Sequence, residues 1–109
     1  MNATYNNAIS HRAATIDELK NDPEFAAAYL QAALQEMDEP DGYAAAMLAL
    51  RDIAQARGGL ATVASVAGIQ RESLYRALSP KGNPTLKTLQ AIFKAVGMRM
   101  TVEPRIAYA

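Results

Sequence analysis

Two short helix-forming stretches on either side of a glycine, within residues 60–78, constrain the fold of this chain more than any other feature. Gly68 can adopt the positive φ that a tight turn between two helices requires. Ala64 is small enough for the two helices to cross closely. The apolar side chains that can hold the second helix against the first are Val63, Ile69, Leu74 and Leu78. This spacing predicts a helix-turn-helix.

The other face of the second helix is polar, and nearly all of its side chains can donate or accept hydrogen bonds, or stack on a sugar. They are Gln70, Arg71, Glu72, Ser73, Tyr75 and Arg76. An α-helix fits the major groove of DNA, where an arginine can bond both acceptors of a guanine edge. Arg71 and Arg76 are therefore candidate base-reading residues. Glu72 is expected either to accept from a cytosine amino group or to hold Arg76 across one turn. The alternative is a pair of small helices in a bundle, with a polar face that is simply solvated.

Helix caps predict two elements near the N-terminus. Residues 1–14 are polar and aperiodic, which indicates a loose, flexible arm. Thr15 with Glu18 three residues later has the capping-box pattern, so a short helix is expected to begin there. Asp22 as N-cap and Pro23 in the first turn predict the start of a second helix.

Helices are also expected before and after the glycine-centred motif. The third helix is expected from Tyr43 to about Arg57, where two glycines end it. The loop at 79–84 holds two prolines, which cannot lie inside a helix. The final helix is expected from Thr85, a good N-cap, to Gly97.

Residues 98–103 alternate apolar and polar side chains, the period-two pattern of a half-buried strand. One strand cannot satisfy its own backbone hydrogen bonds, and the chain offers no second strand. A homodimer that pairs this strand with its copy is therefore expected, through Met98, Met100 and Val102. The alternative is an extended tail that lies on the chain's own helices.

Charge is unevenly distributed along the chain. Residues 1–45 contain two basic and eight acidic side chains, whereas residues 46–109 contain nine basic and three acidic ones. The halves thus carry net charges of −6 and +6. This asymmetry indicates two surfaces with different partners, or else two helix faces that are merely solvated.

Composition excludes several kinds of site. The chain has no cysteine, which removes thiolate metal clusters, disulfides and thiol catalysis. His11 is the only histidine and is read as an incidental surface residue, so neither a metal site nor a cofactor is expected. No apolar run approaches the roughly 20 residues that span a bilayer. We expect a cytoplasmic protein that is not an enzyme and does not act in a membrane.

The most specific stretch of the chain is Gly68-Ile-Gln-Arg-Glu-Ser-Leu-Tyr-Arg-Ala-Leu-Ser79. Shorter matching segments are Asp22-Pro-Glu24, Tyr29-Leu30, Ala33-Leu34, Ile53-Ala54, Gly82-Asn-Pro84 and Thr88-Leu89. With these residues, the region 15–103 resembles the addiction-module antidote proteins, the Xre-type helix-turn-helix antitoxins that include HigA-like members. Where family members often carry serine or threonine at the turn, this chain has Ile69 and Gln70, which alters the capping there.

The resemblance implies an all-α fold. Its expected form is a five-helix lambda-repressor-like helix-turn-helix domain with an N-terminal helical extension and a C-terminal β-strand. Residues 15–109 would form this single domain, with acidic helices at 15–37, the helix-turn-helix at 60–78 and the strand at 98–103.

The resemblance also implies a function. Such an antitoxin is encoded beside a RelE/ParE-like toxin, neutralises it by binding, and represses its own operon as a dimer on a two-fold symmetric operator. By position, the base-reading residues would be Gln70, Arg71, Glu72 and Arg76. The phosphate contacts would be Thr62, Ser73, Tyr75, Lys81, Asn83 and Lys87. The acidic residues that could face a basic toxin are Asp17, Glu18, Asp22, Glu24 and Glu36.

Three other interpretations remain open at this stage. A stand-alone Xre-type repressor without a toxin would have the same DNA surface. A protein-interaction module would have a helix-turn-helix that no longer binds DNA. Finally, residues 15–37 could serve only to widen the domain core or the dimer interface.

Overall fold

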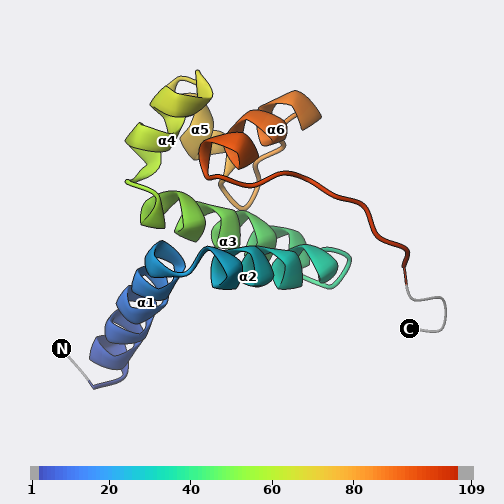
Figure 1. Cartoon of the computed structure of the whole chain (residues 1–109). Helices are drawn as coiled ribbons and strands as arrows, with labels where there is room; N and C mark the ends of the chain where they lie inside the picture. The colour runs from blue at the N-terminus through green and yellow to red at the C-terminus, as the bar shows by residue number, and fades with distance from the viewer. Residues whose placement is uncertain (1–2, 106–109) are drawn as a thin grey trace.

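The computed structural model of the chain describes residues 3–105, and over this range the regular structure is entirely helical (Figure 1). The six helices are α1 (Ala3–Asn21), α2 (Pro23–Gln35), α3 (Gly42–Ala56), α4 (Leu60–Ala67), α5 (Arg71–Ala77) and α6 (Leu86–Ala95). None of these helices is both long enough and apolar enough to cross a bilayer.

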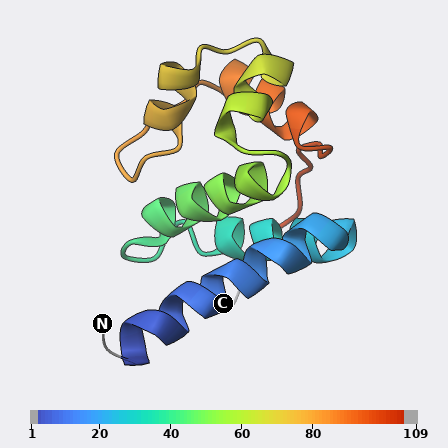
Figure 2. The same cartoon turned by 90° about the vertical axis from the view of Figure 1, so that its left-hand side faces the viewer.

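Helix α3 lies in the middle of the molecule. Helices α1 and α2 pack against it on one side, and α4, α5 and α6 form a second group on the other side (Figures 1 and 2). Every helix contributes apolar side chains to one continuous core. Among them are Leu19, Leu30, Ile53, Val63, Leu74 and Ile92. This shared core holds the α4–α6 group on α3.

Helix caps at two predicted positions are confirmed. The Asp22 carboxylate accepts a hydrogen bond from the backbone N–H of Phe25 at 3.0 Å, and Pro23 occupies the first turn of α2. The Thr85 hydroxyl accepts from the N–H of Thr88 at 3.1 Å at the start of α6. In both helices the side chain satisfies a backbone donor that the helix itself leaves free.

The N-terminal helix is longer than predicted. Helix α1 already begins at Ala3, so residues 3–14 continue it, while residues 1 and 2 lie outside the described range. The interpretation of Thr15 as an N-cap was wrong, because its hydroxyl donates back to the carbonyl of His11 at 3.0 Å inside the helix. No apolar stripe marks residues 3–14, and periodicity therefore could not identify this part of α1.

The predicted fold class was wrong in two respects. The described residues form six helices rather than five, and they contain no strand. The count differs because the prediction assigned the N-terminal helices to an extension outside a five-helix domain, whereas α1 and α2 both pack on α3 as parts of the body.

The segment predicted as a dimer strand, 98–103, is an extended tail on the chain's own helices. Met98 packs against the core, whereas Met100 and Val102 are exposed. The Glu103 carboxylate accepts hydrogen bonds from two α2 side chains, Gln35 at 3.0 Å and Gln31 at 3.5 Å. An alternating pattern gives an extended segment one apolar and one polar face, but it supplies no second strand for the backbone hydrogen bonds. Here the Glu103 side chain forms the hydrogen bonds that hold the segment on α2.

A buried carboxylate joins the three N-terminal helices. Asp52 on α3 accepts from the Arg12 guanidinium of α1 at 2.5 Å and from the Tyr29 hydroxyl of α2 at 3.0 Å. Burial raises the pKa of the Tyr29 phenol, and its hydrogen bond to Asp52 and the Asp52 charge raise this pKa further. The three side chains thereby fix the two N-terminal helices on α3.

Arg57 links the two helix groups at the end of α3. Its guanidinium donates to the carbonyl of Lys20 in the last turn of α1 at 3.2 Å and to the carbonyl of Val96 after α6 at 3.4 Å. Helix C-termini leave carbonyls without intrahelical donors and carry partial negative charge, so a cation between two such ends satisfies both.

Candidate functional site

The turn between α4 and α5 has the predicted geometry. Gly68 adopts φ 72° and ψ 31°, the left-handed conformation, and ends α4. The N–H of Ile69 donates to the carbonyl of Ala64 at 2.9 Å, which reverses the chain direction within a few residues. Ala64 is 2% exposed, as expected for a residue at a close helix contact. Leu74 and Leu78 point into the core, so the predicted packing of α5 is confirmed.

The opposite face of α5 is open to solvent. The exposed residues on it are Gln70, Arg71, Glu72, Tyr75 and Arg76, with Ser73 half-buried beside them. The structure thus brings all the predicted base-reading side chains to one surface. Because nothing in the described chain covers this surface, its hydrogen-bonding groups are available to a partner.

Arg76 and Glu72 do not form the intrahelical pair that was one of two expectations for Glu72. The Arg76 guanidinium lies 3.5 Å from the Ser73 hydroxyl instead. Glu72 takes part in neither of the two ion pairs found among the described residues, which are Arg12–Asp52 and Arg105–Asp38. Its carboxylate is therefore free to accept a hydrogen bond from outside the chain.

A shallow groove with several polar side chains runs between α5, the loop after it and the start of α6. Its polar lining consists of Ser73, Arg76, Ser79, Lys81, Asn83, Thr85 and Thr88. The loop is fixed on α3, since the Tyr43 hydroxyl donates to the carbonyl of Gly82 at 2.6 Å. Three of the predicted phosphate contacts, Ser73, Lys81 and Asn83, therefore meet in one place.

The other predicted phosphate contacts lie apart from this groove. Thr62 and Lys87 are exposed on α4 and α6 without lining it. Tyr75 lies on the far flank of α5, where the guanidinium carbon of Arg51 on α3 stands 5.6 Å from the centre of its ring. At about 100° per residue, Tyr75 and Ser73 point about 160° apart around α5.

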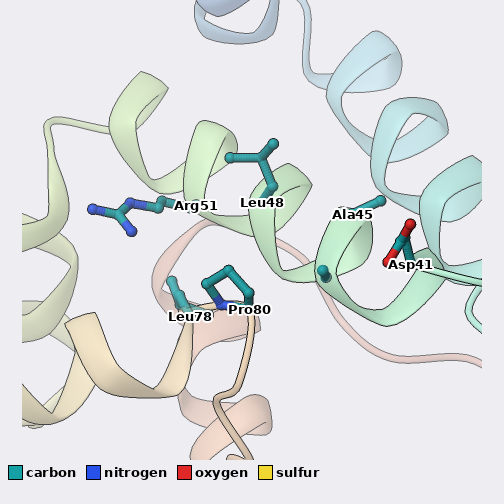
Figure 3. A pocket seen from close by; sticks show the side chains of 7 residues that line it. Asp41, Ala45, Leu48, Arg51, Leu78 and Pro80 are labelled. Atoms are coloured by element: carbon teal, nitrogen blue, oxygen red, sulfur yellow. The ribbon is translucent and has the colours of Figure 1, made fainter.

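Arg51 borders a second hollow, which is mainly apolar. Ala45 and Leu48 of α3 line it together with Leu78 and Pro80, and the Arg51 side chain extends along its edge (Figure 3). Sequence reasoning did not select Arg51, because its approach to Tyr75 depends on how α3 and α5 are placed in space. In a sequence, a single charged residue within a helix indicates only that this face of the helix is solvated.

The acidic residues predicted to face a toxin are exposed but divided. Asp17, Glu18, Asp22 and Glu24 lie around the junction of α1 and α2, and the Asp22 carboxylate is already used as a helix cap. Glu36 follows the other end of α2. The 13 residues of α2 place it about 20 Å from the junction, at 1.5 Å per residue.

Among the described residues, no three histidine, aspartate or glutamate side chains are arranged so that they could hold a metal ion. The groups gathered around α5 are guanidinium, ammonium, amide, hydroxyl and carboxylate groups at a solvent-exposed surface. Such groups recognise a partner by hydrogen bonds and charge.

Comparison with known proteins gives a family match over most of the chain. The family model described as "Probable addiction module antidote protein" matches residues 11–104. A protein of Haemophilus influenzae, described only as "Uncharacterized protein", is 40% identical over 74 residues, which cover 68% of this chain and 75% of the relative. No solved structure matches the chain.

Proposed function

The chain belongs to the family of probable addiction module antidote proteins, and from this membership we propose that it is a DNA-binding antitoxin that represses its own operon. An antidote protein implies a toxin as partner. We propose a RelE/ParE-like toxin, encoded beside this chain and neutralised by direct binding. The protein would act by binding rather than as an enzyme, in the cytoplasm, without a cofactor.

The exposed face of α5 is the observation that carries the DNA-binding role. Arg71, Glu72 and Arg76 project from a short helix that is anchored by Leu74 and Leu78 and held at the Gly68 turn. A helix presented in this way fits the major groove, where arginines bond guanine edges and a carboxylate accepts from cytosine. In this proposal α4 and α5 form the helix-turn-helix.

The groove beside α5 supports the same proposal. Lys81 and Asn83 lie next to the base-reading face, where they can contact phosphates and orient α5 on the duplex. Two copies of the chain would place two α5 helices on half-sites about one helical turn apart, on a two-fold symmetric operator. Since phosphate contacts release counterions, the affinity should fall steeply with salt.

The acidic junction of α1 and α2 is the proposed toxin-binding surface. Asp17, Glu18 and Glu24 are exposed there, on the opposite side of α3 from α5 (Figure 2). Toxin and DNA would then bind separate surfaces. A basic toxin would be attracted to the acidic surface and would leave the base-reading face uncovered.

Two measurements test this proposal together. One is binding of the full chain to the DNA upstream of its gene, compared with scrambled DNA at physiological salt. The other is rescue of growth when the chain is co-expressed with the product of the adjacent gene. The proposal predicts a specific complex and rescue. A specific complex without rescue would instead indicate a stand-alone repressor, and no complex would indicate an interaction module.

A further inference from the structure

Arg51 reaches from α3 to the flank of α5. Its guanidinium carbon lies 5.6 Å from the centre of the Tyr75 ring, a cation–π distance, and the Tyr75 side chain remains 41% exposed. Arg51 belongs to neither of the two ion pairs among the described residues. Its positive charge is therefore not neutralised by a carboxylate.

The position of this cation around α5 is informative. Tyr75 follows Arg71 by four residues, so the two side chains lie on the same side of the helix. The groove with Lys81 lies on the other flank, about 160° around the helix. Cations from outside α5 thus lie on two sides of this helix: Arg51 of α3 on the side of Arg71 and Tyr75, and Lys81 of the loop on the side of Ser73 and Arg76.

We propose that Arg51 is a contact to the DNA backbone, positioned by the Tyr75 ring, on the flank of α5 opposite to Lys81. This inference rests on the proposed DNA-binding function. A helix in the major groove has a phosphate backbone on either side of it, so both flanks of α5 would face phosphates. The proposal adds a residue from α3 to a surface that otherwise comes from the α4–α6 group.

The side chain of Arg51 is suited to this role. Arg51 is half-buried at the edge of the hollow that Leu48 and Leu78 also line (Figure 3), and partial burial restricts the conformations of a long side chain before binding. A guanidinium that stacks on an aromatic ring keeps its in-plane N–H donors free, and these match phosphate oxygens well. The contact would then cost little side-chain entropy.

The test is the salt dependence of DNA affinity for Arg51→Gln. If Arg51 neutralises a phosphate, the slope of log affinity against log salt falls by about 0.9, and operator and scrambled DNA both bind roughly three- to tenfold more weakly. Arg51→Lys keeps the charge and should keep the slope. The matched control is Lys20→Gln, which removes one exposed positive charge at the end of α1, on the other side of α3 from α5. This variant should leave the slope unchanged.

A second variant separates phosphate contact from structural bracing. Tyr75→Leu removes the ring and should lower the affinity of wild type but add little further loss to Arg51→Gln. An unchanged salt slope in Arg51→Gln, with a thermal melt that shows the variant to be folded, would overturn the proposal. A residue that only holds α5 against α3 contacts no phosphate, so its replacement would leave the number of neutralised phosphates, and with it the slope, unchanged. Failure of the wild type to bind any DNA would instead refute the proposed function.

Discussion

Asp52 shows how one side chain can organise three helices. It is 4% exposed and is the only charged residue that is buried where the structure describes side chains. Arg12 and Tyr29 each donate to one of its oxygens. The Arg12 side chain is half exposed, so water can solvate it if the ion pair is broken. The Asp52 carboxylate is buried, so the loss of a partner would leave an unsolvated charge and destabilise the folded state.

Replacing Tyr29 by phenylalanine is predicted to destabilise the protein by about 1–2 kcal/mol, because one buried carboxylate oxygen loses its donor. The pKa of Tyr29 is raised above its ordinary value of 10.0, mainly by burial and then by Asp52. The folded state therefore keeps this proton at pH values where the unfolded chain loses it. The resulting stability is fully present below pH 10.0 and is lost as pH rises through the folded-state pKa.

Urea unfolding of wild type and Tyr29→Phe between pH 8 and pH 11 measures both effects. The wild type should lose stability more steeply than the variant above about pH 10. Parallel curves across the whole range would show that folding does not raise the pKa of Tyr29.

Glu72 is predicted to lower the affinity for DNA in general and to increase discrimination between base pairs. It is exposed on the face of α5 beside Arg71 and has no ion-pair partner among the described residues. A carboxylate facing DNA is repelled by phosphates unless a base donates to it. Glu72→Gln should therefore bind scrambled DNA severalfold more tightly while discrimination at the matching base pair falls by roughly 1–3 kcal/mol. Fluorescence anisotropy on operator and scrambled DNA would measure both, and unchanged binding to both would place Glu72 away from the duplex.

At the scale of elements, the two glycines that bracket α5 have different roles. Gly68 has φ 72°, and open space surrounds the position that a Cβ would take. Gly82 lies under the end of α5, where a Cβ would overlap the carbonyl oxygen of Ala77. The first glycine is needed for its backbone conformation, the second for the close approach of loop and helix.

Alanine substitutions should reveal this difference. Gly68→Ala is predicted to cost about 1–2 kcal/mol of unfolding free energy, the strain of a left-handed non-glycine residue. Gly82→Ala is predicted to cost about 3 kcal/mol or more, because the loop must move away from α5. It should also weaken DNA binding, since Lys81 and Asn83 move with the loop. Equal unfolding costs, measured in urea, would contradict this assignment.

Local signals predicted the elements around α5 and failed at both ends of the chain. Asp22, Gly68 and Thr85 have the predicted cap or turn conformations because each is decided by a few neighbouring residues. Thr15 has the same kind of signal, yet it lies within α1, because a preceding helical segment offers its hydroxyl a carbonyl. The alternation at 98–103 is real, but strand formation depends on a partner that a local pattern does not contain.

The part of the candidate site that lies on the single helix α5 was predictable from the sequence. The exposed face of α5 follows from the positions of Leu74 and Leu78, which the sequence assigns to the core. The approach of Arg51 to Tyr75 joins residues 24 positions apart, and the Asp52 contact to Arg12 joins residues 40 positions apart. Such contacts depend on how whole helices are placed, which one sequence does not specify.

For the whole molecule, the uneven charge along the chain becomes an uneven charge in space. The acidic residues of α1 and α2 lie on one side of α3, and the basic residues around α5 lie on the other (Figures 1 and 2). Partners of opposite charge can therefore be attracted to opposite sides of one small protein.

This separation predicts that the two binding activities can be removed independently. The triple variant Asp17→Asn, Glu18→Gln, Glu24→Gln should lose capture of the adjacent gene's product and growth rescue, with unchanged operator affinity. The control is Asp38→Asn with Glu39→Gln, which removes exposed acids near the far end of α2 and should retain rescue. Co-purification and growth assays measure the outcome. Full rescue by the triple variant would place toxin binding elsewhere.

Operator discrimination by the two arginines of α5 tests the central claim most directly. Arg71→Ala and Arg76→Ala should each weaken operator binding by roughly 1–3 kcal/mol. In titrations by fluorescence anisotropy at physiological salt, the double variant should bind operator no better than scrambled DNA, while the wild type discriminates clearly between them. A folded double variant that still prefers its operator as strongly as the wild type would contradict base reading by α5.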